Sequence, residues 1–363
     1  MSPSAGLQTA LNKMREMSVK EGSIYHQYVP VVTEDTNIGE FGQPILDANL
    51  QPVRNEFISL LKRIVFTAVN TKLFANPLAE LEGDRIPLGY AGQDIYVNPA
   101  KGRAFNVNDF AGLLQKYEAE VATQYLTVNM DVQYPVTVTR AKLKTAFTSW
   151  ANLEEFVTGM INSLYNGAYI DSYKYTKDLV SAAYFGDKAQ YIVINEPNTE
   201  AKGKAFVKKL RELHTRFQLP STEYNAWKKV SGDEAKAITT WSDASDIMIM
   251  IRADVDANID VDVLAAAFNM DKADFIGRVI VVDNFDVYDD EGNKIQDGSS
   301  ILGMIFDKSW FKIKTQDFEM DEFYNANNRT WQYYLNVTKM YNYSLFANGV
   351  ILATEKPPVH YSE

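Results

Sequence analysis

Apolar residues recur at helical spacing in two segments of the chain. Residues 52–74 place them three and four positions apart, and Pro52 stands where proline suits the first turn of a helix. Residues 152–184 carry a longer, uninterrupted stripe with the same spacing. The pattern predicts one amphipathic helix of moderate length and one helix of about 30 residues, about 45 Å long at 1.5 Å per residue.

The N-terminus and the interior of the long helix contain residues with specific structural preferences. Asn152 is expected to cap its first turn, with Glu155 as the capping-box partner three positions later. Gly159 and Gly167 lie inside the stripe, where glycine costs about 1 kcal/mol relative to alanine. We therefore expect a close contact or a bend at these glycines.

Short, continuous apolar runs mark the second half of the chain. They are YIVI (191–194), IMIMI (247–251), VIVV (279–282) and ILGMIF (301–306). Unbroken runs of this length are typical of strands that are covered on both faces of a sheet. Helical patterns at 204–217 and 261–268 separate them, so residues 190–306 are predicted to form an α/β unit.

Strand-like alternation returns near the C-terminus. Residues 310–318 and 331–354 are rich in aromatic and β-branched side chains, as in antiparallel strands. Residues 286–297 have a turn around Gly292 between two strand pieces, which predicts an acidic surface hairpin.

Two segments show little pattern of their own. Residues 1–50 lack strong periodicity and contain several glycines and prolines, so we expect an extended arm rather than a packed domain. Residues 83–130 are rich in glycine, proline and polar residues around short alternating pieces, which predicts a long hairpin with polar side chains on both faces. Loops of this length are uncommon unless they are functional. We hypothesise that this one packs against another subunit.

Composition narrows the function classes. A chain of 363 residues with 46% hydrophobic composition can form two domains of ordinary size. The formal net charge of −11 argues against a general nucleic-acid binder, although not against a protein that encloses nucleic acid. The absence of cysteine excludes disulfides, thiolate metal sites and cysteine nucleophiles.

Nothing in the sequence indicates a membrane protein. The longest apolar runs are far shorter than the roughly 20 residues that a membrane-spanning helix needs. The N-terminal residues lack the apolar region of a signal peptide. We expect a soluble protein made in a cytoplasm.

One acidic stretch resembles a calcium-binding loop at first sight. Its oxygen-bearing residues stand at alternate positions, at Asp254, Asp256, Asn258, Asp260 and Asp262. A calcium loop of this kind needs glycine at position six and glutamate at position twelve, where this chain has Ile259 and Ala265. We therefore interpret the stretch as a strand-to-helix turn, with Asp260 or Asp262 capping a helix that runs through Phe268.

Catalytic signals are also weak. His26 lies in the arm, His360 in the C-terminal tail and His214 on the surface of a predicted helix, and no nucleophile elbow or phosphate-binding glycine motif occurs. Asp283 and Asp286 follow a strand, where α/β active sites are often found, yet a capping role is more common there. We assign no catalytic, cofactor-binding or metal-binding residue, and we do not expect an enzyme.

A family resemblance lies in residues 246–285, which are similar to the middle of major capsid proteins of tailed bacteriophages, especially short-tailed and crAss-like phages. The matching segments are Leu264–Met270 (L-A-x-A-F-N-M), Arg278–Asp283 (R-V-x-V-V-D), Asp307–Phe311 (D-K-x-W-F) and Phe346–Asn348 (F-A-N). These motifs are structural, and they cover about a third of the chain.

The resemblance implies an α+β fold of the Hong Kong 97-like type. The implied parts are an N-terminal arm (1–50), a joining helix (51–82), an extended loop (83–130), a peripheral domain with the long spine helix (131–186 and 307–345) and an axial domain (187–306 and 346–363).

It also implies a structural role. Similar proteins form pentamers and hexamers of an icosahedral shell around double-stranded DNA without sequence-specific binding. The expected partners are copies of the chain itself and scaffolding, portal and head-decoration proteins, in a virion assembled in the host cytoplasm, with no cofactor and no membrane. The alternatives are an encapsulin-like cargo shell with the same fold, and a soluble α/β hydrolase that uses strand-end carboxylates.

Overall fold

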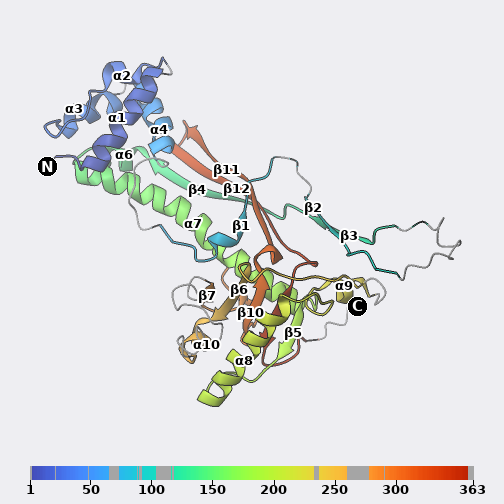
Figure 1. Cartoon of the computed structure of the whole chain (residues 1–363). Helices are drawn as coiled ribbons and strands as arrows, with labels where there is room; N and C mark the ends of the chain where they lie inside the picture. Colours follow the sequence, from blue (N-terminus) through green and yellow to red (C-terminus); the bar gives the residue numbers. More distant parts are fainter. Residues whose placement is uncertain are drawn as a thin grey trace. The chain divides into compact units, whose positions relative to one another are not determined.

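The computed structural model (Figure 1) describes most of the chain. The described residues are 2–20, 22–47, 49–64, 73–87, 89, 92–103, 116, 118–232, 237–259, 278–289 and 291–358. The chain divides into two compact units, each made of three segments. The first unit comprises Met1–Asn76, Asp131–Ser172 and Asp317–Thr338, and the second comprises Pro77–Met130, Tyr173–Gln316 and Lys339–Glu363.

The N-terminal segment is helical and packed. Its helices are α1 (Ala5–Lys20), α2 (Tyr25–Tyr28), α3 (Ile38–Leu46) and α4 (Gln51–Ile64). The expectation of an extended arm over residues 1–50 is therefore wrong. Leu7, Leu11 and Met14 stand four and three positions apart on one face of α1 and are buried in the core of the first unit.

Helix α4 confirms the first part of the amphipathic helix predicted at 52–74, and residues 65–72 lie outside the described residues. Phe57 of α4 is fully buried and packs against Phe41 of α3, with ring centroids 6.3 Å apart. Phe147 lies 5.5 Å from Phe57, so aromatic contacts join α3 and α4 to the segment before the long helix.

The long helix is confirmed as α7 (Trp150–Phe185), of 36 residues. Asn152 is not its cap. The Ser149 hydroxyl instead accepts a hydrogen bond from the Asn152 backbone N–H (3.1 Å), which is the bond expected of an N-cap residue. A Cβ on Gly167 would lie 3.1 Å from the Tyr134 ring, so the expected close contact exists at this glycine, whereas Gly159 faces open space.

A four-stranded sheet has the order β1-β11-β12-β4. Its strands are β1 (Glu82–Gly83), β4 (Met130–Thr139), β11 (Phe311–Asn325) and β12 (Thr330–Tyr343). Alternate residues of β12 are buried, and Tyr333, Leu335 and Val337 reach the core of the first unit. The C-terminal alternation therefore identified these strands correctly.

A five-stranded sheet of order β5-β13-β10-β6-β7 forms the core of the second unit. Its strands are β5 (Gln190–Val193), β6 (Ile247–Arg252), β7 (Val279–Val282), β10 (Ile301–Asp307) and β13 (Gly349–Ala353). β10 runs antiparallel to its neighbours β6 and β13, while β7 and β5 pair with those strands in parallel. All four apolar runs are strands, as predicted.

Helix α8 (Glu200–Phe217) covers this sheet through its buried residues Phe206, Leu210 and Leu213. The helix predicted at 261–268 lies outside the described residues. The remaining elements are η1 (Ala79–Leu81), β2 (Gly92–Val97), β3 (Val121–Leu126), α6 (Arg140–Ala146), α9 (Trp227–Ser231), α10 (Ala253–Ala257), β8 (Val287–Tyr288), β9 (Lys294–Gln296) and η3 (Lys308–Trp310). β8 and β9 pair antiparallel and confirm the hairpin predicted at 286–297. None of the helices in the described ranges is long and apolar enough to cross a membrane.

Candidate assembly surface

The strand-end carboxylates are held by structural bonds. Asp283 accepts hydrogen bonds from the Tyr173 hydroxyl (2.7 Å) and the buried Lys177 Nζ (3.0 Å). Burial raises the pKa of Asp283, but these two bonds, the Asn284 backbone N–H and the charge of Lys177 together leave the pKa below its usual value. Asp286 accepts from the Gly298 N–H (2.8 Å) and pairs with Lys294 (3.1 Å). Both carboxylates therefore fasten loops to their surroundings.

A neighbouring carboxyl group has the opposite environment. Asp178 lies one residue after Lys177 on α7, and its buried Oδ1 has no hydrogen-bond partner among the described residues. Burial raises its pKa to about 6, against the opposing influence of Lys177 and Lys174. The folded protein therefore binds a proton at Asp178 more tightly than the unfolded chain does.

Stability is expected to depend on pH through Asp178. Because its pKa is raised on folding, the free energy of unfolding should fall as pH rises from about 4 through about 6, by about 1–3 kcal/mol for this partly buried group. Asp178→Asn should remove this fall and stabilise the protein at pH 7.5. Urea unfolding of unassembled protein at pH 4.5 and 7.5 measures the effect, with the exposed Asp35→Asn as control. Equal pH dependence in all three proteins would contradict the prediction.

The two histidines that the structure describes, His26 and His214, belong to different units. The His26 backbone N–H donates to the Ser18 hydroxyl (3.1 Å) in the first unit. His214 belongs to the second unit and is half-buried in α8 rather than fully on its surface, and burial and Arg278 lower its pKa. His360 lies outside the described residues.

Among the residues that the structure describes, no three histidine, aspartate or glutamate side chains gather closely enough to hold a metal ion. The acidic stretch starts with helix α10, directly after β6. Asp254 accepts a hydrogen bond from Arg252 Nη2 (2.7 Å), and the buried Arg252 also binds Glu196 (2.8 Å). Asp260 and Asp262 lie outside the described residues, so their capping role stays a prediction.

The predicted loop at 83–130 contains an antiparallel hairpin, formed by β2 and β3 (Figure 1). Val97 pairs with Val121 and Gly92 with Leu126. Successive side chains on a strand point to opposite faces, so the hairpin has two faces of different environment.

The inner face of the hairpin is fixed to the C-terminal segment of the second unit. The Gln124 side chain donates to the Tyr343 carbonyl (2.7 Å) and accepts from the Leu345 N–H (2.9 Å). The Tyr96 ring lies 5.9 Å from the Phe346 ring. Hydrogen bonds and ring packing therefore hold this face in place.

The outer face exposes a group of large apolar side chains beside the polar Gln93 and Thr123. The exposed apolar residues are Ile95 (55%), Val97 (57%), Val121 (57%) and Tyr125 (76%). Large apolar side chains grouped on one face of a fixed hairpin are typical of an interaction surface. Both faces carry polar side chains, as expected, with Gln93 and Thr123 on the outer face and Asp94 and Gln124 on the inner face, but the apolar group on the outer face was not predicted. The alternation of Ile95 and Val97 was the signal that could have revealed this surface.

A buried ion pair lies at the base of the hairpin segment. Glu82 of β1 accepts from the buried Lys339 Nζ at 2.8 and 3.0 Å and from the Thr315 hydroxyl. β1 pairs in parallel with β11, so the carboxylate is held where the segment leaves the four-stranded sheet.

Removing the Glu82 charge is expected to destabilise the protein. Glu82→Gln removes the carboxylate that the buried Lys339 ammonium contacts at 2.8 Å, and we expect a loss of about 2–3 kcal/mol in unfolding free energy. The double variant Glu82→Gln with Lys339→Met should recover much of the loss, because both charges of the pair are then removed. Denaturant unfolding at pH 7 tests both. A single variant within about 0.5 kcal/mol of the parent protein contradicts the role of this pair.

Comparisons with known proteins agree with this architecture. The family model described as Phi29-like phage major capsid protein matches residues 11–353. The major capsid protein of Bacillus phage PZA is 31% identical over 358 residues, covering 98% of this chain and 75% of that protein. The major capsid protein of Bacillus phage B103 is 32% identical over 335 residues, covering 91% of this chain and 70% of that protein.

Two solved structures with a similar fold are phage capsids. A chain in the capsid of Staphylococcus phage Andhra has a TM-score of 0.63 at 15% identity, covering 81% of this chain and 88% of that one. A chain in the capsid of cyanophage P-SCSP1u has a TM-score of 0.50 at 10% identity, covering 80% and 91%. The fold is therefore the expected α+β, Hong Kong 97-like fold. Together with the family match over most of its length, this shows that the chain belongs to the Phi29-like phage major capsid proteins and is a component of the virion.

Proposed function

We propose that the chain assembles with copies of itself into pentamers and hexamers of an icosahedral shell that encloses double-stranded DNA. The observation that carries the proposal is the outer face of the β2–β3 hairpin, with its four exposed apolar side chains. The inner face is bonded to the second unit, so the outer face is presented in a fixed position. A neighbouring copy would bury it, and because each aliphatic side chain is only about half exposed in the subunit, its further burial would contribute about 1 kcal/mol.

The net charge of −11 supports enclosure of DNA without tight binding. Phosphate-rich DNA is repelled by an acidic protein, and a tight binder needs lysine and arginine to displace counterions. The genome would therefore be held by the closed shell rather than by specific contacts.

The proposal includes an assignment of the chain to the domains of a capsid subunit. We assign residues 83–130 to the extended loop, and 131–186 with 307–345 to a peripheral domain that contains the spine helix. Residues 187–306 with 346–363 form the axial domain. This last grouping is supported by β13, which pairs with β10 and β5 in one sheet. Residues 1–50 and 51–82 remain the N-terminal arm and the joining segment, with the arm folded into helices.

The chain acts as a structural protein in this proposal, with no catalytic, cofactor-binding or metal-binding residue. The bonds that hold Asp283 and Asp286 support this reading over a hydrolase. Scaffolding, portal and head-decoration proteins are its further proposed partners, and the host cytoplasm is the proposed place of assembly.

Electron microscopy of the purified protein tests the assembly function. We expect closed shells, tubes or hexameric capsomers, alone or with a co-expressed scaffolding protein. A protein that stays monomeric over a wide range of salt and protein concentration, with and without scaffold, would overturn the proposal.

A further inference from the structure

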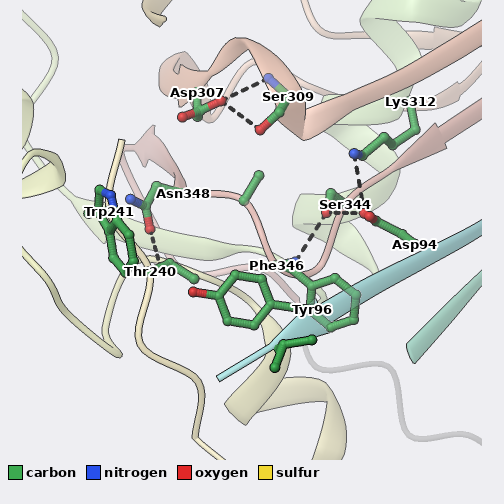
Figure 2. Close-up of a pocket in the computed structure, with 12 residues that line it drawn as sticks. Asp94, Tyr96, Thr240, Trp241, Asp307, Ser309, Lys312, Ser344, Phe346 and Asn348 are labelled. Carbon is green, nitrogen blue, oxygen red and sulfur yellow. Dashed lines mark hydrogen bonds and ion pairs between the residues drawn. The ribbon is translucent and has the colours of Figure 1, made fainter. Parts of the chain in front are cut away.

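A cavity of about 430 Å³ lies in the second unit beside the hairpin (Figure 2). Its lining comes from Asp94, Tyr96, Val97, Thr240, Trp241, Asp307, Ser309, Lys312, Ser344, Phe346, Ala347 and Asn348. Its size is within the range of natural ligand pockets. Sequence motifs singled out above, Asp307–Phe311 and Phe346–Asn348, supply five of these residues.

Several polar side chains that line the cavity bond to one another. Thr240 donates to the Asn348 side chain (2.7 Å), and the Asp94 carboxylate pairs with Lys312 (3.3 Å). Asp307 has hydrogen-bond partners but, among the described residues, no cationic partner. Its Oδ1 accepts from the backbone N–H (2.9 Å) and the hydroxyl (2.6 Å) of Ser309, and no lysine or arginine of the described chain forms an ion pair with it.

The cavity therefore carries one uncompensated negative charge. Asp94 and Lys312 neutralise each other, which leaves the charge of Asp307. Lys308 follows Asp307 in sequence, but its side chain is exposed and does not line the cavity. A carboxylate in such a place favours a cationic ligand.

An aromatic ring stands in the same cavity. Trp241 is 53% exposed, which is unusual for such a large side chain, and its ring lines the cavity together with Asp307 (Figure 2). An indole face attracts cations, and arginine in particular stacks on aromatic rings while it bonds a carboxylate. The pair Trp241 and Asp307 thus suits the side chain of arginine or lysine.

The position of the cavity indicates which partner molecule supplies the lysine or arginine side chain. Val97 both lines the cavity and belongs to the apolar outer face of the hairpin. A partner that covers the outer face would therefore also meet the cavity mouth. Under the proposed function that partner is another copy of this chain.

We propose that this cavity is a socket for an arginine or lysine side chain of a second copy of the chain, held between Asp307 and Trp241. The inference rests on the proposed shell function and adds to it a defined polar anchor beside the apolar hairpin face. The anchor favours one register of the contact, because in that register the cation meets both the Asp307 carboxylate and the Trp241 ring.

Photo-crosslinking tests the socket. A benzoylphenylalanine at position 241, in shells mixed from ¹⁴N- and ¹⁵N-labelled copies, should give crosslinks between copies to a peptide that contains a lysine or arginine. Crosslinks confined to one chain, crosslinks to a different protein, or the absence of crosslinks between copies would each overturn the proposal.

A charge variant gives an independent readout. Asp307→Asn keeps an acceptor for Ser309 but removes the charge, and should raise the protein concentration needed for assembly about tenfold or more at low salt. The exposed Asp243→Asn, which does not line the cavity, is the matched control. Assembly of Asp307→Asn at the parent concentration would overturn the socket. If the parent protein itself forms no shells, the proposed function fails instead.

Discussion

Ile95→Asp is expected to abolish shell assembly while leaving the folded subunit intact. Ile95 is 55% exposed on the outer face of the hairpin, so the carboxylate remains in water in the isolated subunit. In the shell it would be buried against a neighbour without a partner, which costs several kcal/mol at each contact. Every subunit repeats that contact, so the loss multiplies across the assembly. Electron microscopy and sedimentation measure shell yield, and circular dichroism checks the fold.

Ile295→Asp is the matched control for this prediction. Ile295 is 65% exposed and also lies on a strand of a two-stranded hairpin, β8–β9, but it is not part of the outer face. We expect normal shells from it. Normal shells from Ile95→Asp, or equal loss of shells in both variants, would show that the outer face of β2–β3 is not the assembly surface.

Trp310→Ala is expected to cause a large loss of stability. Trp310 is 1% exposed, stacks on Tyr343 with centroids 5.1 Å apart and meets Phe311 edge-on at 4.7 Å. A Cβ on Gly349 would come within 2.8 Å of its ring, which shows how closely the backbone packs there. Deleting the indole leaves a cavity that this packing cannot fill, for a cost of about 3–5 kcal/mol.

Trp241→Ala provides the contrast for Trp310. Since Trp241 is 53% exposed, we expect the unfolding free energy of the Trp241→Ala variant to stay within about 0.5 kcal/mol of that of the parent protein. Guanidinium unfolding of unassembled protein, followed by circular dichroism, compares the two variants. A loss below about 1 kcal/mol for Trp310→Ala would contradict the packing described here.

The strands of the second unit were predictable because their burial on both faces produces a recognisable sequence pattern. Residues of β6, β10 and β13 are buried along nearly their whole length, and burial on both faces requires continuous apolar runs. The long helix α7 was predictable for the same reason, since its stripe is uninterrupted. Its cap was not, because Thr148, Ser149 and Asn152 can all cap a helix and only the backbone path selects Ser149.

The parts that were wrong depend on contacts between distant residues. Helix α1 is packed because its apolar residues belong to one core with residues of α7 and β12 far along the chain, and a short apolar stripe among polar residues does not reveal them. The outer face of the hairpin was missed for a related reason. Which face of β2 and β3 is covered is decided by Tyr343 and Leu345, more than 200 residues away.

The discontinuous units set an order for biosynthesis. The first unit needs Asp317–Thr338 to complete its core, and the Tyr333 hydroxyl from that segment bonds to the Ile58 carbonyl of α4 (3.0 Å). Roughly 240 residues separate Asn76 from Asp317, so at about 5–20 residues per second the ribosome needs roughly 10–50 s to deliver the missing strands. During that interval the apolar faces of the N-terminal helices lack their final partners. The nascent subunit therefore offers chaperones a defined and recurring target before it can join a shell.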